Sequence, residues 1–312
     1  MSSYVEARDV AGAVAAMASG ARPIAGGTDL VVGARHGKAP LPDSLVGIHR
    51  IVGLAEIAEA DGVIRIGSLA THASILGSGV LRAAAPGLLD ASSIVGSHAT
   101  RANGTIGGNV MNASPAMDTG APLLCHGAVA VLTGPSGTRR LGLDELWTGP
   151  GRTSASADEL MEGLELPVPP AGSGSAYVRL QYRRQMEIAV VGAAAYVELD
   201  GDTITTARVA ITALTPVICR VPAAEESLVG QRWDASAMPA SGSSADVGQP
   251  AFISAAGGAA AAAATPISDV RASAAYRTAM AAVVARRAVT AALRRAAGKP
   301  VTIPASDWSE QR

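Results

Sequence analysis

Cysteine is scarce in this chain. Only Cys125 and Cys219 occur among 312 residues, and they stand far apart in the sequence. Two thiols exclude a disulfide framework, a four-thiolate metal site and an iron–sulfur cluster built from this chain alone. The five histidines are scattered and no HExxH segment occurs. The sequence therefore predicts no metal site and two unpaired thiols in the core.

Blocks of charge and long apolar runs are also missing. Charged residues make up 16% of the chain and the net charge is −1, without the clusters that mark a nucleic-acid-binding surface. No run of about twenty residues is apolar enough to span a membrane. The first residues contain Glu6 and Asp9 in place of the basic start of a signal peptide. We expect a cytoplasmic protein with no membrane span and no nucleic-acid partner.

The chain does contain short periodic segments separated by glycine-rich turns. Hydrophobic residues make up 48% of it, enough for a large core in two or three structural units. Helices are expected at residues 10–18, 71–76, 87–94 and 274–295, the last with Ser273 as its N-cap. Residues 22–35 indicate a strand, a glycine turn and a short helix or extended segment. Further strands are expected at residues 44–48 and 63–66, with a hairpin of 128–132 and 139–143.

The second half of the chain has a different pattern. Residues 167–174 lose all periodicity and indicate a linker. Strand-like runs at 175–184, 188–199 and 204–214 predict a small antiparallel sheet. Residues 235–264 are biased to Ala, Ser and Gly, and their composition fits either a helix or a flexible segment.

The first candidate binding segment is AGGTDL. Gly26 and Gly27 can adopt backbone angles closed to other residues, so that successive N–H groups converge on an anion such as pyrophosphate. Thr28 adds a hydroxyl donor. The same residues also fit an ordinary turn, and neither a GxGxxG fingerprint nor a complete P-loop occurs.

The second candidate lies in residues 97–124, a long polar and glycine-rich passage expected to lack regular structure. Within it, GTIGGNVMNASPAMD offers glycines for close backbone approach and side chains for hydrogen bonds. These residues are Gly104, Gly107 and Gly108, with Thr105, Asn109, Asn112 and Ser114. Asp118 could accept from ligand hydroxyls or cap the helix that follows.

Together, AGGTDL and TIGGNVMNASPAMD resemble the paired FAD-binding signatures of the molybdopterin dehydrogenase FAD-binding subunits, a family that includes carbon monoxide dehydrogenase medium subunits and xanthine dehydrogenase flavin subunits. The similarity spans residues 20–296 and continues through YVRLQYRRQMEIAVVGAAA and SDVRASAAYRTAMAAVVARRAV. It implies an α+β fold, with a PCMH-type FAD-binding region in two subdomains, residues 1–55 and 56–170. A C-terminal α+β domain with a three-stranded antiparallel sheet would occupy residues 175–297.

The resemblance also implies a set of FAD-binding residues. The residues Ala25, Gly26, Gly27, Thr28 and Asp29 would surround the pyrophosphate. The other members of the set are Ile24, Leu30, Arg101, Thr105, Gly107, Gly108, Asn109, Asn112, Ser114, Asp118, Arg179 and Ile188. Ile188 would lie by the isoalloxazine ring, where the carbon monoxide enzyme has Tyr. The chain departs from the family pattern at Arg179, which is usually Lys, at Gln181 and Tyr182, usually Gly-Arg, and at His98 and Thr100.

No side chain forms a convincing nucleophile or acid–base pair, so no catalytic residue is predicted and the chemistry is assigned to the cofactor. By resemblance, electrons leave a purine or other N-heterocycle on a large molybdopterin subunit and cross 2Fe–2S clusters on a small subunit. They reach FAD here and pass to NAD or another acceptor, in a heterohexamer. Two alternatives stay open: a stand-alone FAD reductase similar to the UDP-sugar reductase of cell-wall synthesis, and a flavin-free scaffold subunit.

Overall fold

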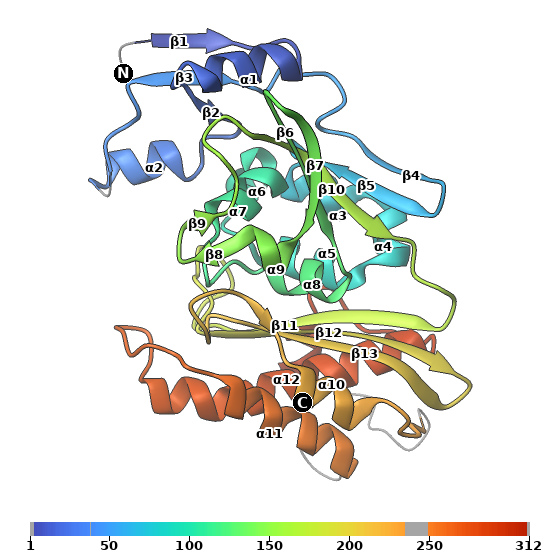
Figure 1. Cartoon of the computed structure of the whole chain (residues 1–312). Helices are drawn as coiled ribbons and strands as arrows, with labels where there is room; N and C mark the ends of the chain where they lie inside the picture. Colours follow the sequence, from blue (N-terminus) through green and yellow to red (C-terminus); the bar gives the residue numbers. More distant parts are fainter. Residues whose placement is uncertain (1–2, 38, 235–248, 311–312) are drawn as a thin grey trace.

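The computed structural model describes residues 3–37, 39–234 and 249–310. Figure 1 shows three larger sheets that follow one another from the N-terminal to the C-terminal end of the molecule. The uppermost is a parallel sheet in the order β1-β3-β2. Its elements are β1 (Ser3–Glu6), α1 (Val10–Ala18), β2 (Arg22–Ile24), α2 (Leu30–Arg35) and β3 (Ser44–Gly47). The helix, turn and strands predicted in this part are confirmed, although β1 has no predicted counterpart.

The middle of the molecule is built on a five-stranded antiparallel sheet in the order β4-β5-β10-β6-β7. Its strands are β4 (Ile57–Ala60), β5 (Val63–Gly67), β6 (Val129–Gly134), β7 (Gly137–Gly142) and β10 (Leu160–Pro167). The predicted hairpin is confirmed as β6 and β7. The central strand β10 has no predicted counterpart, because it is buried along both faces and its residues do not alternate in polarity.

Short helices cover this sheet. They are α3 (His72–Gly77), α4 (Gly79–Ala84), α5 (Pro86–Ile94), α6 (His98–Asn103), α7 (Ile106–Asn112), α8 (Gly120–Cys125) and α9 (Leu143–Leu146), followed by the small hairpin of β8 (Trp147–Gly149) and β9 (Arg152–Thr153). The expectation that residues 97–124 lack regular structure is wrong. Side-chain caps explain the difference: Ser97 accepts from the Thr100 N–H and Thr105 from the Gly108 N–H, which starts α6 and α7.

The C-terminal part holds an antiparallel sheet in the order β11-β12-β13-β14. Its elements are β11 (Ser173–Leu180), β12 (Val191–Asp200), β13 (Thr203–Thr212), β14 (Cys219–Arg220), α10 (Pro222–Leu228), α11 (Ala251–Ala263), α12 (Ala274–Ala296) and α13 (Ala305–Glu310). The three predicted strands are confirmed, and β14 adds a two-residue edge. Ser273 caps α12 as predicted. The alanine-rich tract is helical in α11, whereas residues 235–248 lie outside the described residues.

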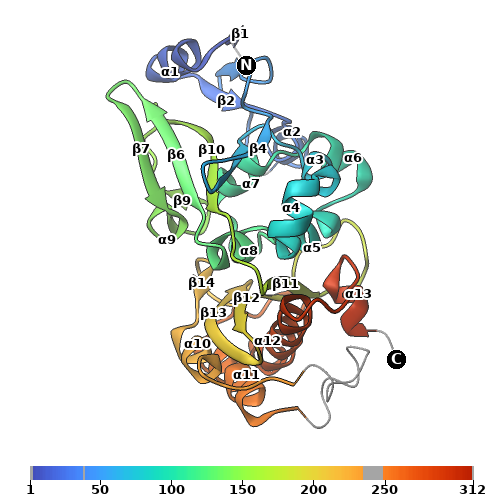
Figure 2. The same cartoon turned by 90° about the vertical axis from the view of Figure 1, so that its right-hand side faces the viewer.

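Both faces of this sheet are covered (Figure 2). Tyr177 and Tyr196 pack into the core of the middle part, while Ala193 and Val197 pack into a second core beneath α11 and α12. Since β12 is buried on both sides, its sequence is a continuous apolar run and not an alternating one. The sheet therefore joins the two halves of the chain.

Within the described ranges, no helix combines the length and apolar character that crossing a bilayer requires. Both cysteines are free, but only Cys125 is a core thiol, because Cys219 is half-buried. Burial raises the pKa of the Cys125 thiol well above its usual value. The domain limits at residues 55, 170, 175 and 297 stay predictions.

Candidate functional site

The first glycine loop, residues 25–29, connects β2 to α2. Gly27 has φ +67°, in the left-handed region that favours glycine. Gly26 does not need this conformation, but a Cβ on it would overlap the main-chain carbonyl of Asn103, whose carbon would lie 2.6 Å away. Glycine is thus required at both positions, for two different reasons.

The second glycine loop, residues 104–109, begins directly after Asn103. Thr105 caps α7, with its hydroxyl accepting from the Gly108 N–H at 3.1 Å. A Cβ on Gly107 would lie only 2.6 Å from Ser68 Cβ. By contrast, the sole close neighbour of a Cβ on Gly108 would be Thr105 Oγ1, at 3.1 Å. Gly107 therefore serves internal packing, whereas Gly108 is exposed and free for close approach by a ligand.

A third segment, residues 68–72, lies under the second loop. It runs antiparallel to it, with an isolated bridge between Thr71 and Thr105. The Ile106 N–H donates to the Ala70 carbonyl at 2.9 Å, and the His72 N–H donates to the Gly104 carbonyl at 3.1 Å. We call residues 68–72 the floor segment. The sequence predicts a helix from residue 71, which is confirmed as α3, but neither candidate binding segment includes residues 68–72.

The two glycine loops meet. Besides the contact of Gly26 with Asn103, Thr28 Oγ1 lies 3.4 Å from the position that a Cβ on Gly104 would take. Segments about eighty residues apart in the sequence are thereby placed side by side, with glycines at the contact. The main chains of the two loops approach each other closely, and the Thr28 side chain lies beside Gly104. Main-chain N–H groups brought together in this way can bind an anion.

Other predicted site residues have roles within the protein. Asn109 Oδ1 accepts from the Thr119 hydroxyl at 2.6 Å, and Ser114 Oγ accepts from the Ala116 N–H at 3.3 Å. Arg101 is buried and donates to the Val95 carbonyl at 2.9 Å. The remaining members of the set lie at the surface or half-buried: Ile24, Ala25, Asp29, Leu30 and Asn112.

Asp118 and Arg179 form a buried ion pair between the middle part and β11. Arg179 Nη1 lies 2.7 Å from Asp118 Oδ2, and the two side chains are 0% and 8% exposed. The Tyr177 hydroxyl donates to Asp118 Oδ1 at 2.7 Å, and Arg179 Nε donates to Gln181 Oε1 at 3.0 Å. Burial raises the pKa of the Asp118 carboxyl, while Arg179 and Tyr177 act in the opposite direction. Asp118 is not the N-cap of α8, a position that Thr119 occupies.

The loop between β11 and β12 reaches back to α6 and to the residues just before it. The Met186 N–H donates to the Gly96 carbonyl at 2.9 Å, and the Thr100 hydroxyl donates to Met186 Sδ at 3.8 Å. Ile188 follows in the same loop with 46% of its surface exposed. The apolar side chain predicted to lie by the flavin ring is therefore available for contact and is carried by a loop tied to α6.

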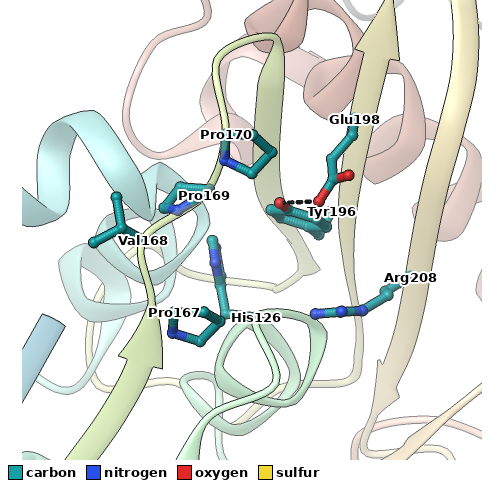
Figure 3. Close-up of a pocket in the computed structure, with 8 residues that line it drawn as sticks. All are labelled: His126, Pro167, Val168, Pro169, Pro170, Tyr196, Glu198 and Arg208. Carbon is teal, nitrogen blue, oxygen red and sulfur yellow. Dashed lines mark hydrogen bonds between the residues drawn. The ribbon is translucent and has the colours of Figure 1, made fainter. Parts of the chain in front are cut away.

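A separate cavity of about 170 Å³ lies between the linker and β12 and β13 (Figure 3). His126 bonds to Ser175 Oγ at 3.0 Å, the Tyr196 hydroxyl donates to Glu198 at 2.6 Å, and Arg208 donates to the Cys125 carbonyl at 3.1 Å. Each of these lining groups has a partner within the protein, and neither glycine loop lines the cavity. It is not part of the candidate site.

Two family models match this chain. The model for the FAD binding domain in molybdopterin dehydrogenase matches residues 1–169, which contain both glycine loops. The chain belongs to the molybdopterin dehydrogenase FAD-binding family. A second model, for the CO dehydrogenase flavoprotein C-terminal domain, matches residues 176–247 and 240–292. The cofactor of this family member is FAD, and its fold is the PCMH-type FAD-binding fold.

Individual relatives agree with this assignment. The carbon monoxide dehydrogenase medium chain of Afipia carboxidovorans is 33% identical over 296 residues, which cover 94% of this chain and 97% of that protein. The xanthine dehydrogenase FAD-binding subunit of Escherichia coli O157:H7 is 31% identical over 224 residues, which cover 70% and 76%. A structure of carbon monoxide dehydrogenase from Hydrogenophaga pseudoflava has a TM-score of 0.85 at 30% identity, with 94% of this chain and 97% of that chain covered.

Proposed function

We propose that this molybdopterin dehydrogenase family member is the FAD subunit of a cytoplasmic heterohexameric complex with a large molybdopterin subunit and a small 2Fe–2S subunit. The observation that carries the proposal is the close contact of Gly26 with the Asn103 carbonyl, which brings the two glycine loops together. Bound FAD would accept electrons from the clusters and pass them to NAD or another acceptor.

The work of this chain in that reaction is to hold and orient the cofactor. Main-chain groups of residues 24–30 would face the diphosphate, and residues 105–109 would lie along the diphosphate and flavin. Ile188 would cover one part of the flavin ring with an apolar side chain and exclude water there. Asp118 and Arg179 satisfy each other, so we propose that they act by fixing the chain after α7 and not by a free charge.

The substrate would be oxidised on the large subunit, and we propose a purine or another N-heterocycle. One observation supports this class: the relatives include subunits named for xanthine, nicotinate and nicotine. By the resemblance, Ile188 also stands where the carbon monoxide enzyme has Tyr. The test is flavin reduction in the purified complex under anaerobic conditions, with purines, pyridine carboxylates and carbon monoxide compared. Reduction by carbon monoxide alone would contradict the proposed substrate class.

The subunit assignment is tested by purifying the tagged chain from its native cells. We expect about one FAD per chain by absorbance and mass spectrometry, together with molybdenum, iron and two further subunits. A solitary flavoprotein that reduces a substrate with NADPH would establish the stand-alone reductase. A flavin-free complex containing this chain would establish the scaffold.

A further inference from the structure

His72 lies where the two glycine loops meet, although neither loop contains it. It is the first residue of α3 and the last of the floor segment. Its ring atom Cδ2 lies 3.5 Å from the position that a Cβ on Gly104 would take, and Thr28 Oγ1 lies 3.4 Å from the same point. The imidazole thus borders the second loop beside a side chain of the first.

Two buried polar atoms of the floor segment have no hydrogen-bond partner among the described residues. His72 is 2% exposed, and its Nδ1 has no hydrogen-bond partner among the described residues. Ser68 Oγ, at the other end of the floor segment, is likewise buried without a partner in the described part of the chain. Buried polar atoms in folded proteins nearly always have partners. Two such atoms directly beneath a cofactor loop therefore indicate that this region is completed by a ligand.

Charged and titratable groups lie on each of the three helices packed against α3. Arg82 of α4 donates to the Leu76 carbonyl, and Asp90 of α5 pairs with Arg295. On α6, His98 is exposed, whereas Arg101 is buried and acts on the ring. Burial, with the Arg101 charge added, lowers the pKa of His72 to about 4. The imidazole is neutral at physiological pH before any anion binds.

We propose that the His72 side chain is part of the FAD site and takes up a proton when the cofactor's diphosphate binds between the loops. This inference rests on the proposed function, because it requires the loops to hold FAD. The diphosphate brings negative charge near the ring and favours its protonated form. The proton comes from the buffer, and no bond in the cofactor changes.

The sign of the pH dependence follows from linkage. The complex with FAD binds more protons than the chain without FAD. The affinity for FAD therefore falls as pH rises from about 4, the pKa of His72 without FAD, to the higher pKa of His72 in the complex. Above that higher pKa the affinity becomes independent of pH. Full uptake of one proton corresponds to about a tenfold change in affinity per pH unit.

The experiment is calorimetric titration of the flavin-free full-length chain with FAD at pH 6, in two buffers of different ionisation enthalpy. We expect uptake of about half a proton or more in the wild-type chain and less than about a tenth in His72→Gln, which can hydrogen-bond but cannot be protonated. The matched control is His126→Gln. His126 is also buried, and burial with Arg208 lowers its pKa to about 4, but it lines the separate cavity. It should retain wild-type uptake.

The wild-type measurement decides the matter even if His72→Gln does not fold. FAD binding without proton uptake overturns the inference and leaves the proposed function intact. Equal uptake in wild type and His72→Gln also overturns the role of His72. A chain that binds no FAD at all overturns both.

Discussion

The two glycine loops of this FAD-binding chain are held in different ways. The second loop is part of the core: Thr105 caps its helix, Ile106 is fully buried, and the floor segment pairs with it. The first loop leads into α2, which has no buried residue and no side-chain cap from Asp29. The second loop is therefore formed by the core of the fold, whereas the first loop is positioned by the contact of Gly26 with Asn103.

The first prediction concerns stability and removes one partner of the buried ion pair between Asp118 and Arg179. Asp118→Ala would leave the guanidinium of Arg179 buried without its partner, which costs about 3–5 kcal/mol in comparable cases. We expect a decrease of that order in the free energy of unfolding, measured by urea denaturation of the full chain. The double variant Asp118→Ala/Arg179→Met, which removes both charges, should recover most of the loss. A single variant within about 1 kcal/mol of wild type would contradict the buried pair.

The second prediction concerns a variant that moves the two glycine loops apart and leaves the core residues unchanged. Gly26→Val places a branched side chain against the Asn103 carbonyl, so the first loop must move away. FAD affinity should fall by about a hundredfold or more, because one side of the binding site is displaced, while the unfolding free energy changes by less than about 1 kcal/mol. The flavin-to-protein absorbance ratio and a fluorescence titration measure this. Gly33→Ala in α2, where a Cβ has open space, is the control and should retain FAD.

The third prediction compares alanine substitutions at two adjacent glycines of the second loop, Gly107 and Gly108, and its expected changes are the smallest of the three. Gly107→Ala pushes a methyl group into Ser68 and should lower stability by about 1–3 kcal/mol, the usual cost of overpacking. Gly108→Ala meets only Thr105 Oγ1 and should weaken FAD binding with little change in thermal unfolding. If both variants lose stability equally, the division between a packing glycine and a ligand-facing glycine is wrong.

The sequence predicts the long elements and the two loops, because periodicity and glycine turns are local signals. It does not predict why glycine is needed at each position. Gly26 is required by a contact with Asn103, a residue about eighty positions away, which no local pattern reveals. The same holds for the ion pair of Asp118 with Arg179, which forms only when β11 packs on α5 and α8. His72 is not predicted for a different reason: it stands at a helix start and belongs to no motif. Only the folded structure shows its burial, its unpartnered Nδ1 and its place beside Gly104.

Because the C-terminal sheet packs into a core on each face, we expect neither half of the chain to fold independently of the other. Cutting the chain in the linker would expose Tyr177 and Tyr196 on one fragment and would strip Asp118 of its counter-charge on the other. Flavin retention should therefore be a property of the undivided polypeptide. We therefore expect a change in the second half that tilts β11 to weaken FAD binding, because β11 packs on α5 and its Tyr177 hydroxyl donates to Asp118.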